Sequence, residues 1–356
     1  MKIALMGEGS VVHTLRWAEY FHSRGDTVRL FTLENPPDDF QVDWKKVGRR
    51  DQSHALSYTL ALPRMKRALD DFAPDMVNAH FVPNYGWMGA LVGRRPLVVS
   101  TWGSDVLVNP RKSPFHRWRL RYVLERADLI TSDAEMMTEE IHRYVNGAAP
   151  VLTAPMGMDR AFYDRGEGEL SRDPVLLQFR NLEPVYDLPT VLKALPDFLA
   201  QNPTWRVRIA GEGSQRVKLE RMAAKLGFDE RVSFLGRLSR EELVEELRRA
   251  RLYLSASLSD STSVSLLEAM ALGAYPVLSD IPANREWVGG PGEGLYFPPG
   301  DSIGLSKTLN RAAQMSEEKQ REAAVLNRNI IAERAIWEDN MDRVREAFLT
   351  LAEGRS

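Results

Sequence analysis

Two carboxylates enclose a short polar segment in the second half of the chain. Asp260 and Glu268 stand eight positions apart, and the residues between them read Ser-Thr-Ser-Val-Ser-Leu-Leu. A helix that begins in this segment would offer its free backbone N–H groups to a phosphate. A carboxylate one turn further along would accept hydrogen bonds from sugar hydroxyls. The residue types and their spacing therefore predict a nucleotide-sugar site.

A strand and a helix must hold this pair of acids in place. The apolar run 252–255 comes just before Asp260, and a helical pattern over 265–272 contains Glu268. The same order of strand, polar loop and helix recurs along the chain. We predict strands at 3–6, 28–32, 76–79, 97–101, 129–132, 151–153, 175–179, 206–210, 232–235, 252–255, 276–279 and 295–297, and helices at 15–23, 60–72, 188–200, 215–226, 240–250, 265–272, 303–315 and 317–353. Short apolar runs separated by amphipathic helices are typical of parallel sheets covered on both faces.

The two alternating halves predict an α/β fold of two Rossmann-like, doubly wound domains that face each other across a cleft. A length of 356 residues fits about two domains. Residues 155–174 are rich in glycine and charge and interrupt the periodicity, so we interpret them as the interdomain linker. We expect an acceptor-side domain at 1–160, a nucleotide-sugar-binding domain at 161–335, and a C-terminal helix at 336–356 that crosses back to the first domain.

The composition narrows the classes of partner and compartment. A net charge of -2 argues against nucleic acid as a partner of the whole chain. Because the chain has no cysteine, it has no disulfide and no thiolate metal site. The apolar run at the N-terminus is too short for a signal peptide, and no run of about 18 apolar residues exists. We expect a cytoplasmic protein, with peripheral contact at the inner face of a membrane as an option.

Candidate ligand contacts follow the first predicted strand. Residues 7–10 read Gly-Glu-Gly-Ser, and glycine there lets a ligand approach the backbone closely, so Gly9 and Ser10 are candidate donor contacts. Val12 occupies the third glycine position of a dinucleotide fingerprint, so an ordinary strand-to-helix turn is the alternative. His13 opens the next helix, where the helix dipole slightly disfavours positive charge. It is an acceptor-side candidate, and a plain surface position is its alternative.

Polar side chains also follow later strands, at the edge where parallel sheets bind ligands. His80 ends one strand of the first half. Trp102 and Asp105 follow the next strand and are acceptor-side candidates, like His13. Asp105 has two interpretations, as a hydroxyl-orienting acid or as the N-cap of a short helix. Arg180 follows the first strand of the second half, where a guanidinium would bind a diphosphate. Glu212 follows the next strand and is a candidate contact for the nucleotide base.

The segment 111–126 combines many cations with one acid and three aromatic residues, Phe115, Trp118 and Tyr122. At helical spacing, these aromatic residues would lie on one broad stripe with the aliphatic residues Leu120, Val123 and Leu124. A basic amphipathic helix suits an anionic membrane surface. The alternative is a helix docked on its own sheet with a solvated charged face. Because the basic character is confined to this one segment, nucleic acid is the less favoured partner.

Asp260 and Glu268 with their neighbours resemble the retaining glycosyltransferases of family 4, the two-Rossmann (GT-B) nucleotide-sugar transferases. That family's motif is an acid, seven residues and then Glu, usually followed by Ala-Met, as at 268–270 here. The resemblance covers most of the chain and is strongest over 175–288. In the second half, residues 276–280 and 284–287 also look like segments of the family. In the first half, the histidine at 80, the loop Thr-Trp-Gly-Ser-Asp at 101–105 and the hinge at 155–159 are similar to the family's.

The resemblance implies a role for each matched position. Glu268 would bind the ribose of the nucleotide, Asp260 would hold hydroxyls of the donor sugar, and His80 would contact the transferred sugar. The distal phosphate would be bound by Arg180 and by the backbone N–H groups of Ser263, Val264 and Ser265.

Three positions depart from the family's pattern. Asp260 is one methylene shorter than the usual glutamate. The region 183–187 lacks the lysine that usually accompanies the arginine, and Trp102 replaces a histidine. The nucleotide half of the site is therefore closer to the family's pattern than the sugar half.

The sequence favours transfer chemistry without a cofactor. It contains neither a Ser/His/Asp or Cys/His set nor an Asp-x-Asp metal motif beside a strand end. We expect retaining, metal-independent transfer of a sugar from a nucleotide-sugar to a hydroxyl of a glycan, a lipid-linked acceptor or a small molecule. The resemblance implies a UDP-sugar as the donor, since this is the family's common donor. The alternatives are an epimerase or hydrolase on the same fold, and a non-catalytic nucleotide-sugar-binding module. A nicotinamide dehydrogenase is a further alternative, which rests on the glycines at 7 and 9 alone.

Overall fold

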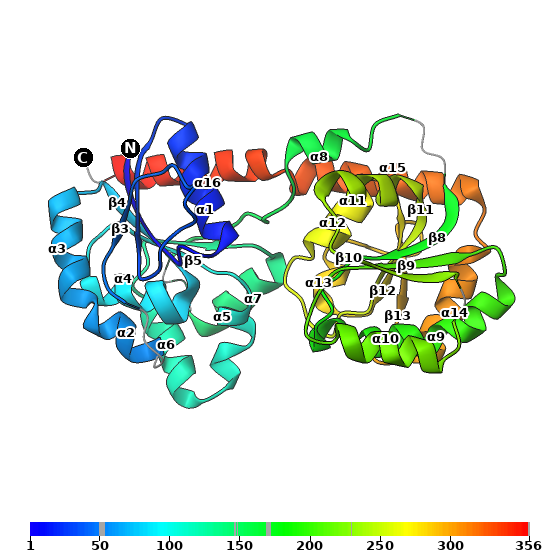
Figure 1. Cartoon of the computed structure of the whole chain (residues 1–356). Helices are drawn as coiled ribbons and strands as arrows, with labels where there is room; N and C mark the ends of the chain where they lie inside the picture. The colour runs from blue at the N-terminus through cyan, green and yellow to red at the C-terminus, as the bar shows by residue number, and fades with distance from the viewer. Residues whose placement is uncertain (50–53, 146, 148, 169–171, 229, 355–356) are drawn as a thin grey trace. The chain divides into compact units, whose positions relative to one another are not determined.

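The computed structural model describes residues 1–49, 54–145, 147, 149–168, 172–228 and 230–354 (Figure 1). The chain folds into two compact units. The first unit consists of Met1–Ala154 and Met341–Ser356, and the second consists of Pro155–Asn340. Each unit is an α/β layer structure around its own parallel sheet, so the predicted fold class of two Rossmann-like domains is confirmed.

The sheet of the first unit has, in the described residues, the strand order β3-β2-β1-β4-β5-β6-β7, with every neighbouring pair parallel. Its strands are β1 (Lys2–Met6), β2 (Thr27–Thr32), β3 (Trp44–Lys46), β4 (Met76–His80), β5 (Leu97–Ser100), β6 (Leu129–Ser132) and β7 (Val151–Thr153). The helices are α1 (Val12–Ser23), α2 (His54–Leu60), α3 (Leu62–Phe72), α4 (Trp87–Val92), α5 (Ser104–Leu107), α6 (Pro114–Leu124) and α7 (Glu135–Tyr144), with a π-helical turn η1 (Phe81–Gly86) and a 3-10 turn η2 (Asn109–Arg111).

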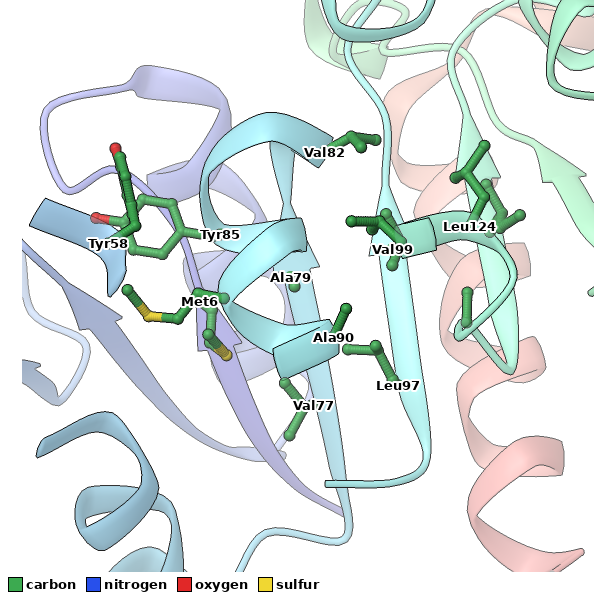
Figure 2. Close-up of a cluster of buried hydrophobic side chains, with 14 of the residues drawn as sticks. Met6, Tyr58, Val77, Ala79, Val82, Tyr85, Ala90, Leu97, Val99 and Leu124 are labelled. Carbon is green, nitrogen blue, oxygen red and sulfur yellow. The ribbon is translucent and has the colours of Figure 1, made fainter. Parts of the chain in front are cut away.

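Burial on both faces explains why the strands of this sheet read as short apolar runs. All five residues of β4 are buried, and so are all four of β5. Figure 2 shows part of this core, in which side chains of the sheet meet those of η1 and α6, namely Met6, Val77, Ala79, Val82, Leu97, Val99 and Leu124. Helices cover a parallel sheet on both sides, so its strands gain little from polar side chains.

One strand of this sheet was not predicted. β3 pairs with β2 at the edge of the sheet, and its three residues, Trp44, Lys45 and Lys46, are all exposed. An exposed edge strand needs neither an apolar run nor an alternating pattern, and charged side chains are typical of such edges.

The sheet of the second unit has, within the described ranges, the strand order β10-β9-β8-β11-β12-β13, again with parallel pairs. Its strands are β8 (Asp173–Gln178), β9 (Arg206–Ala210), β10 (Val232–Gly236), β11 (Ala250–Ser255), β12 (Tyr275–Ser279) and β13 (Leu295–Phe297). The helices are α8 (Arg160–Asp164), α9 (Leu188–Gln201), α10 (Arg216–Lys225), α11 (Arg240–Arg249), α12 (Val264–Ala271), α13 (Pro282–Arg285), α14 (Ser302–Ala313), α15 (Glu317–Arg334) and the start of α16 (Trp337–Glu353), with a 3-10 turn η3 (Pro184–Tyr186).

The segment that we interpreted as a linker belongs largely to the second unit. Residues 155–168 include α8, whose Phe162 is buried in that unit's core. The backbone N–H of Met158 donates to the carbonyl of Ala335 at 2.9 Å, and Met158 accepts from the N–H of Trp337 at 2.8 Å. The chain therefore passes between the units at 154/155 rather than at 160/161.

The same backbone pairing divides the C-terminal helical stretch. We predicted one helix over 317–353, but α15 ends at Arg334 and α16 begins at Trp337, because the backbone at 335–336 bonds to Met158 instead. α16 continues from the second unit into the first, where Phe348 stacks on Phe21 with ring centroids 5.2 Å apart. No helix in the ranges that the structure describes has both the length and the apolar character needed to cross a membrane.

Candidate functional site

Arg180 is held at the carboxyl end of the second sheet by the start of a helix. It lies two residues beyond β8, and its Nη1 donates to Ser263 Oγ at 2.7 Å and to Ser265 Oγ at 2.9 Å. Its Nη2 donates to Asp260 Oδ2 at 2.5 Å. The guanidinium carbon also lies 4.2 Å from the centre of the Tyr186 ring. These contacts fix a buried cation beside the first turn of α12.

The first turn of α12 is suited to binding an anion. Ser263 is the N-cap, and its hydroxyl accepts the backbone N–H of Leu266 at 3.4 Å. The backbone N–H groups of Val264 and Ser265 come next, in the first turn of a helix, where no intrahelical acceptor exists. These groups and the guanidinium of Arg180 place several hydrogen-bond donors next to one another, as an anion such as phosphate requires.

Asp260 is bound to Arg180 in this structure. One oxygen accepts from the guanidinium, and the other accepts the backbone N–H of Ser261 at 3.1 Å. Burial raises the pKa of Asp260, and the charge of Arg180 opposes that rise. The expected contact between Asp260 and a sugar hydroxyl stays a prediction, and the structure adds a second property of this carboxylate, which is to orient Arg180.

Glu268 is a half-buried carboxylate in the middle of α12, and it makes no side-chain hydrogen bond within the described part of the chain. Its pKa is raised to about 7, mainly by burial, with a smaller rise from Asp159 and an opposing effect of the charges of Arg240 and Arg180. Arg240 itself donates to Asp159 at 2.7 Å. A carboxylate that is desolvated but has no hydrogen-bond donor is chemically ready to accept donors from a ligand.

Glu212 lies on a loop that packs directly on the backbone next to Arg180. Gly211 has φ +120, and a Cβ at this position would lie 2.7 Å from the carbonyl oxygen of Arg180. Only glycine tolerates both this positive φ and the close approach of the Arg180 carbonyl oxygen. The side chain of Glu212 is half exposed and forms an ion pair with Arg216 one helical turn away. Its predicted contact with a nucleotide base stays a prediction.

Four aromatic rings gather at the carboxyl edge of the first sheet. His13 is stacked on Trp102 with ring centroids 5.6 Å apart. His80 contacts Trp102 at 5.1 Å and Trp17 at 5.0 Å, in both cases edge to face. Sequence reasoning found three of these residues and missed Trp17. The sequence spacing could have identified Trp17, because it lies four positions after His13 and therefore on the same helix face.

His80 is buried and neutral. Its Nε2 lies 2.9 Å from Asn78 Oδ1, and its Nδ1 has no hydrogen-bond partner among the described residues. Burial, together with the smaller effect of the nearby His13, lowers the pKa of His80 to about 3. At neutral pH this imidazole therefore acts as a hydrogen-bonding group without charge.

Gly9 and Ser10 lie after β1 in the first unit and are engaged by the chain itself. The N–H of Gly9 donates to Thr32 Oγ1 at 3.0 Å, and a Cβ on Gly9 would lie 2.9 Å from the carbonyl oxygen of Glu34. The hydroxyl of Ser10 donates to Glu34 Oε2 at 2.5 Å. Close packing on residue 34 explains the glycine without a ligand, and the donor contacts predicted for both residues stay predictions.

Asp105 connects two loops of the first unit. Its carboxylate accepts the backbone N–H of Val82 in η1 at 3.1 Å and that of Trp102 at 3.0 Å. Burial raises the pKa of Asp105 from 3.8 to about 6, although its backbone hydrogen bonds oppose the rise. Both carboxylate oxygens are occupied by the chain, so the geometry favours a positioning function for Asp105 over direct contact with an acceptor.

We expect Asp105→Ala to lower the free energy of unfolding by about 2–5 kcal/mol, because one buried and one partly buried N–H group would lose their acceptor. Urea unfolding followed by tryptophan fluorescence measures this, with the exposed Asp39→Ala as the control. In the wild type, the native state holds the Asp105 proton between pH 3.8 and about 6, where the unfolded chain has lost it. Its contribution to stability therefore falls as the pH rises through this window. A cost no larger than that of Asp39→Ala would contradict this function of Asp105.

Two family models together match most of the chain. The first half matches "Glycosyl transferase 4-like" over residues 2–134, and the second matches "Glycosyl transferases group 1" over residues 159–327. The chain belongs to the group 1 glycosyltransferases, with the GT-B fold.

Curated relatives agree with this assignment at low identity. The chain is 24% identical over 319 residues to a glycogen synthase of Mycobacterium tuberculosis, which covers 87% of this chain and 72% of the relative. It is 29% identical over 187 residues to an exopolysaccharide phosphotransferase of Streptomyces coelicolor, and that match spans 52% of this chain but 19% of the relative. Among solved structures, HepE of Anabaena in complex with UDP has a TM-score of 0.77 at 17% identity and covers 99% of this chain and 100% of its own. That similarity concerns the fold.

Proposed function

We propose that this glycosyltransferase moves a sugar from a UDP-sugar to a hydroxyl of a glycan, a lipid-linked acceptor or a small molecule, with retention of the anomeric configuration. The observation that carries the proposal is the buried Arg180, which is held at the start of α12. The same helix carries Glu268, whose carboxylate makes no side-chain hydrogen bond to the residues that the structure describes. The choice of uridine is supported by HepE, a protein of the same fold that was solved with UDP.

Different groups of the second unit bind different parts of the nucleotide-sugar donor. Glu268 accepts hydrogen bonds from the ribose hydroxyls, and the N–H groups at the start of α12 bind the diphosphate together with Arg180. In the reaction, the bond between the anomeric carbon and the phosphate oxygen breaks, and a bond to the acceptor oxygen forms on the same face. The acceptor's proton passes to the departing phosphate, and the negative charge that develops there is stabilised by Arg180.

Binding of nucleotides gives the first test. We expect titration calorimetry to detect UDP binding that is weaker in Glu268→Ala, and unchanged in Glu245→Ala, an exposed glutamate on α11. GDP serves as the comparison for the base, and NAD tests the dehydrogenase alternative. Binding of NAD with no binding of UDP or GDP would overturn the proposal.

A non-catalytic binding module is the second candidate, because Asp260 already occupies one edge of the Arg180 guanidinium and no lysine follows in 183–187. Incubation with UDP-sugars separates the candidates, since a transferase hydrolyses its donor slowly even without an acceptor. Release of UDP that depends on Arg180 supports the transferase, whereas tight binding with no release supports the module.

We also propose that transfer needs no bound metal, because Arg180 and the start of α12 supply positive charge at the diphosphate. We expect the rate of sugar transfer to stay within about twofold after treatment with EDTA and removal of the chelator. Loss of activity that is restored by Mg²⁺ or Mn²⁺ would contradict this part of the proposal.

A further inference from the structure

Helix α6 has two faces of different character. Leu120, Val123 and Leu124 are buried in the core of the first unit. The side chains of Phe115 and Trp118 remain 57% and 51% exposed. The sequence led us to place the aromatic and aliphatic residues on one stripe, but the structure exposes Phe115 and Trp118, whereas Tyr122 is half-buried against the core. Phe115 and Trp118 are therefore not needed to dock α6 on its own sheet.

These exposed rings form a continuous cluster with a residue of another helix. Trp118 lies 5.8 Å from Phe115 and 5.4 Å from Tyr122, measured between ring centroids. Trp87, at the start of α4, lies 5.8 Å from Trp118 and 5.1 Å from Tyr122. Two helices thus present one aromatic surface, which we call the α4–α6 aromatic face and define as Trp87, Phe115, Trp118 and Tyr122.

Cations surround the α4–α6 aromatic face. Arg111, Lys112, Arg117, Arg119 and Arg126 form no ion pair within the described ranges, and Arg121 lies 3.8 Å from Glu125. The guanidinium of Arg126 lies 3.5 Å from the centre of the Tyr122 ring, and that of Arg119 lies 5.7 Å from the centre of the Phe115 ring. In a chain of net charge -2, this is a strong local excess of positive charge.

We propose that the α4–α6 aromatic face docks on the surface of a lipid bilayer that contains anionic phospholipid. Indole and phenyl rings prefer the interfacial region of a bilayer, and arginines attract the anionic head groups. A second copy of this chain fits the face less well, because it would bring the unpaired arginines of both copies together. The proposal does not depend on the proposed transfer chemistry.

Cosedimentation with vesicles tests the charge requirement. In low-salt buffer, we expect the full chain to bind vesicles that contain phosphatidylglycerol, and not vesicles of phosphatidylcholine alone. The double variant Arg117→Gln/Arg126→Gln should bind about 30-fold more weakly, since each cation near an anionic leaflet contributes about fivefold. The matched control is Arg64→Gln/Arg67→Gln, which removes two exposed arginines of α3 and should bind like the wild type.

Fluorescence quenching by brominated phospholipid tests the aromatic contact. We expect quenching of the wild type on vesicles, and a smaller quench in Trp118→Phe, which keeps a ring at this position. Circular dichroism verifies that each variant is folded. The proposal is overturned if the wild type does not bind anionic vesicles, if both arginine pairs have equal effects, or if sedimentation velocity shows a dimer that Trp118→Ala converts to monomer.

Discussion

Replacing Arg180 with lysine is expected to lower the rate constant for sugar transfer by about a hundred- to a thousandfold, the usual effect of removing one group that stabilises developing negative charge. Lysine keeps the charge but has a single nitrogen, so it cannot reproduce the planar fork in which Nη1 contacts Ser263 and Ser265 while Nη2 contacts Asp260. Steady-state release of UDP from the donor that a screen identifies gives the rate constant. Arg221→Lys, at an exposed position of α10, is the control and should leave the rate unchanged.

The ion pair between Arg180 and Asp260 allows a sharper version of this experiment. If Asp260 acts by orienting Arg180, then Asp260→Asn and Arg180→Lys should not have additive effects, and the double variant should be about as slow as Arg180→Lys alone. Additive losses would assign Asp260 to an independent contact with the donor sugar, as the family resemblance implies. A rate for Arg180→Lys within a few-fold of the wild type would remove Arg180 from the chemistry altogether.

The affinity for UDP is expected to depend on the ionisation of Glu268. Its pKa is raised to about 7, so the carboxylate is largely protonated below that pH and loses part of its capacity to accept hydrogen bonds from ribose. We expect the affinity to fall as the pH decreases through about 7, and Glu268→Ala to weaken binding by about a hundredfold, the loss of two hydrogen bonds to a charged group. Calorimetry across this pH range measures both effects.

Glu268→Gln provides the control for this pH dependence, because the phosphate of UDP also titrates. The amide cannot ionise, so only the phosphate's contribution should remain in this variant. The free energy of unfolding should depend on pH in the opposite direction to the affinity for UDP. The native wild type holds the Glu268 proton between pH 4.5 and about 7, so its free energy of unfolding falls as the pH rises through that window, and Glu268→Gln should lack this decrease. Equal pH profiles of UDP affinity in both proteins would contradict the assignment of Glu268.

The sequence was most informative where burial determines the pattern. Strands such as β6 and β12 were predicted to within one residue of the bounds that they have, because their residues are all buried and read as short apolar runs. β3 was missed because its exposed residues need no such pattern. The break between α15 and α16 was missed because it depends on a backbone pairing with Met158, which is far away in the sequence.

In the candidate site too, contacts between residues that are far apart in the sequence could not be predicted. The positions after the strands identified Arg180, Asp260 and Glu268, because parallel strands end at one edge of a sheet. The partners of these residues could not be predicted, since Arg180 and Asp260 are 80 positions apart and no local pattern relates them. The absence of hydrogen bonds to Glu268 in the described residues likewise emerged only once the chain around α12 was folded.

If the second unit of this chain activates a nucleotide-sugar for transfer, Arg180 and Glu268 must be needed for release of the nucleotide. The most direct measurement is the release of nucleoside diphosphate from a panel of UDP- and GDP-sugars, by wild type and by the variant Arg180→Ala/Glu268→Ala. We expect release from at least one donor by the wild type, and a loss of at least about a hundredfold in the variant. Equal release by both proteins, or no release from any donor by a wild type that is folded, would contradict it.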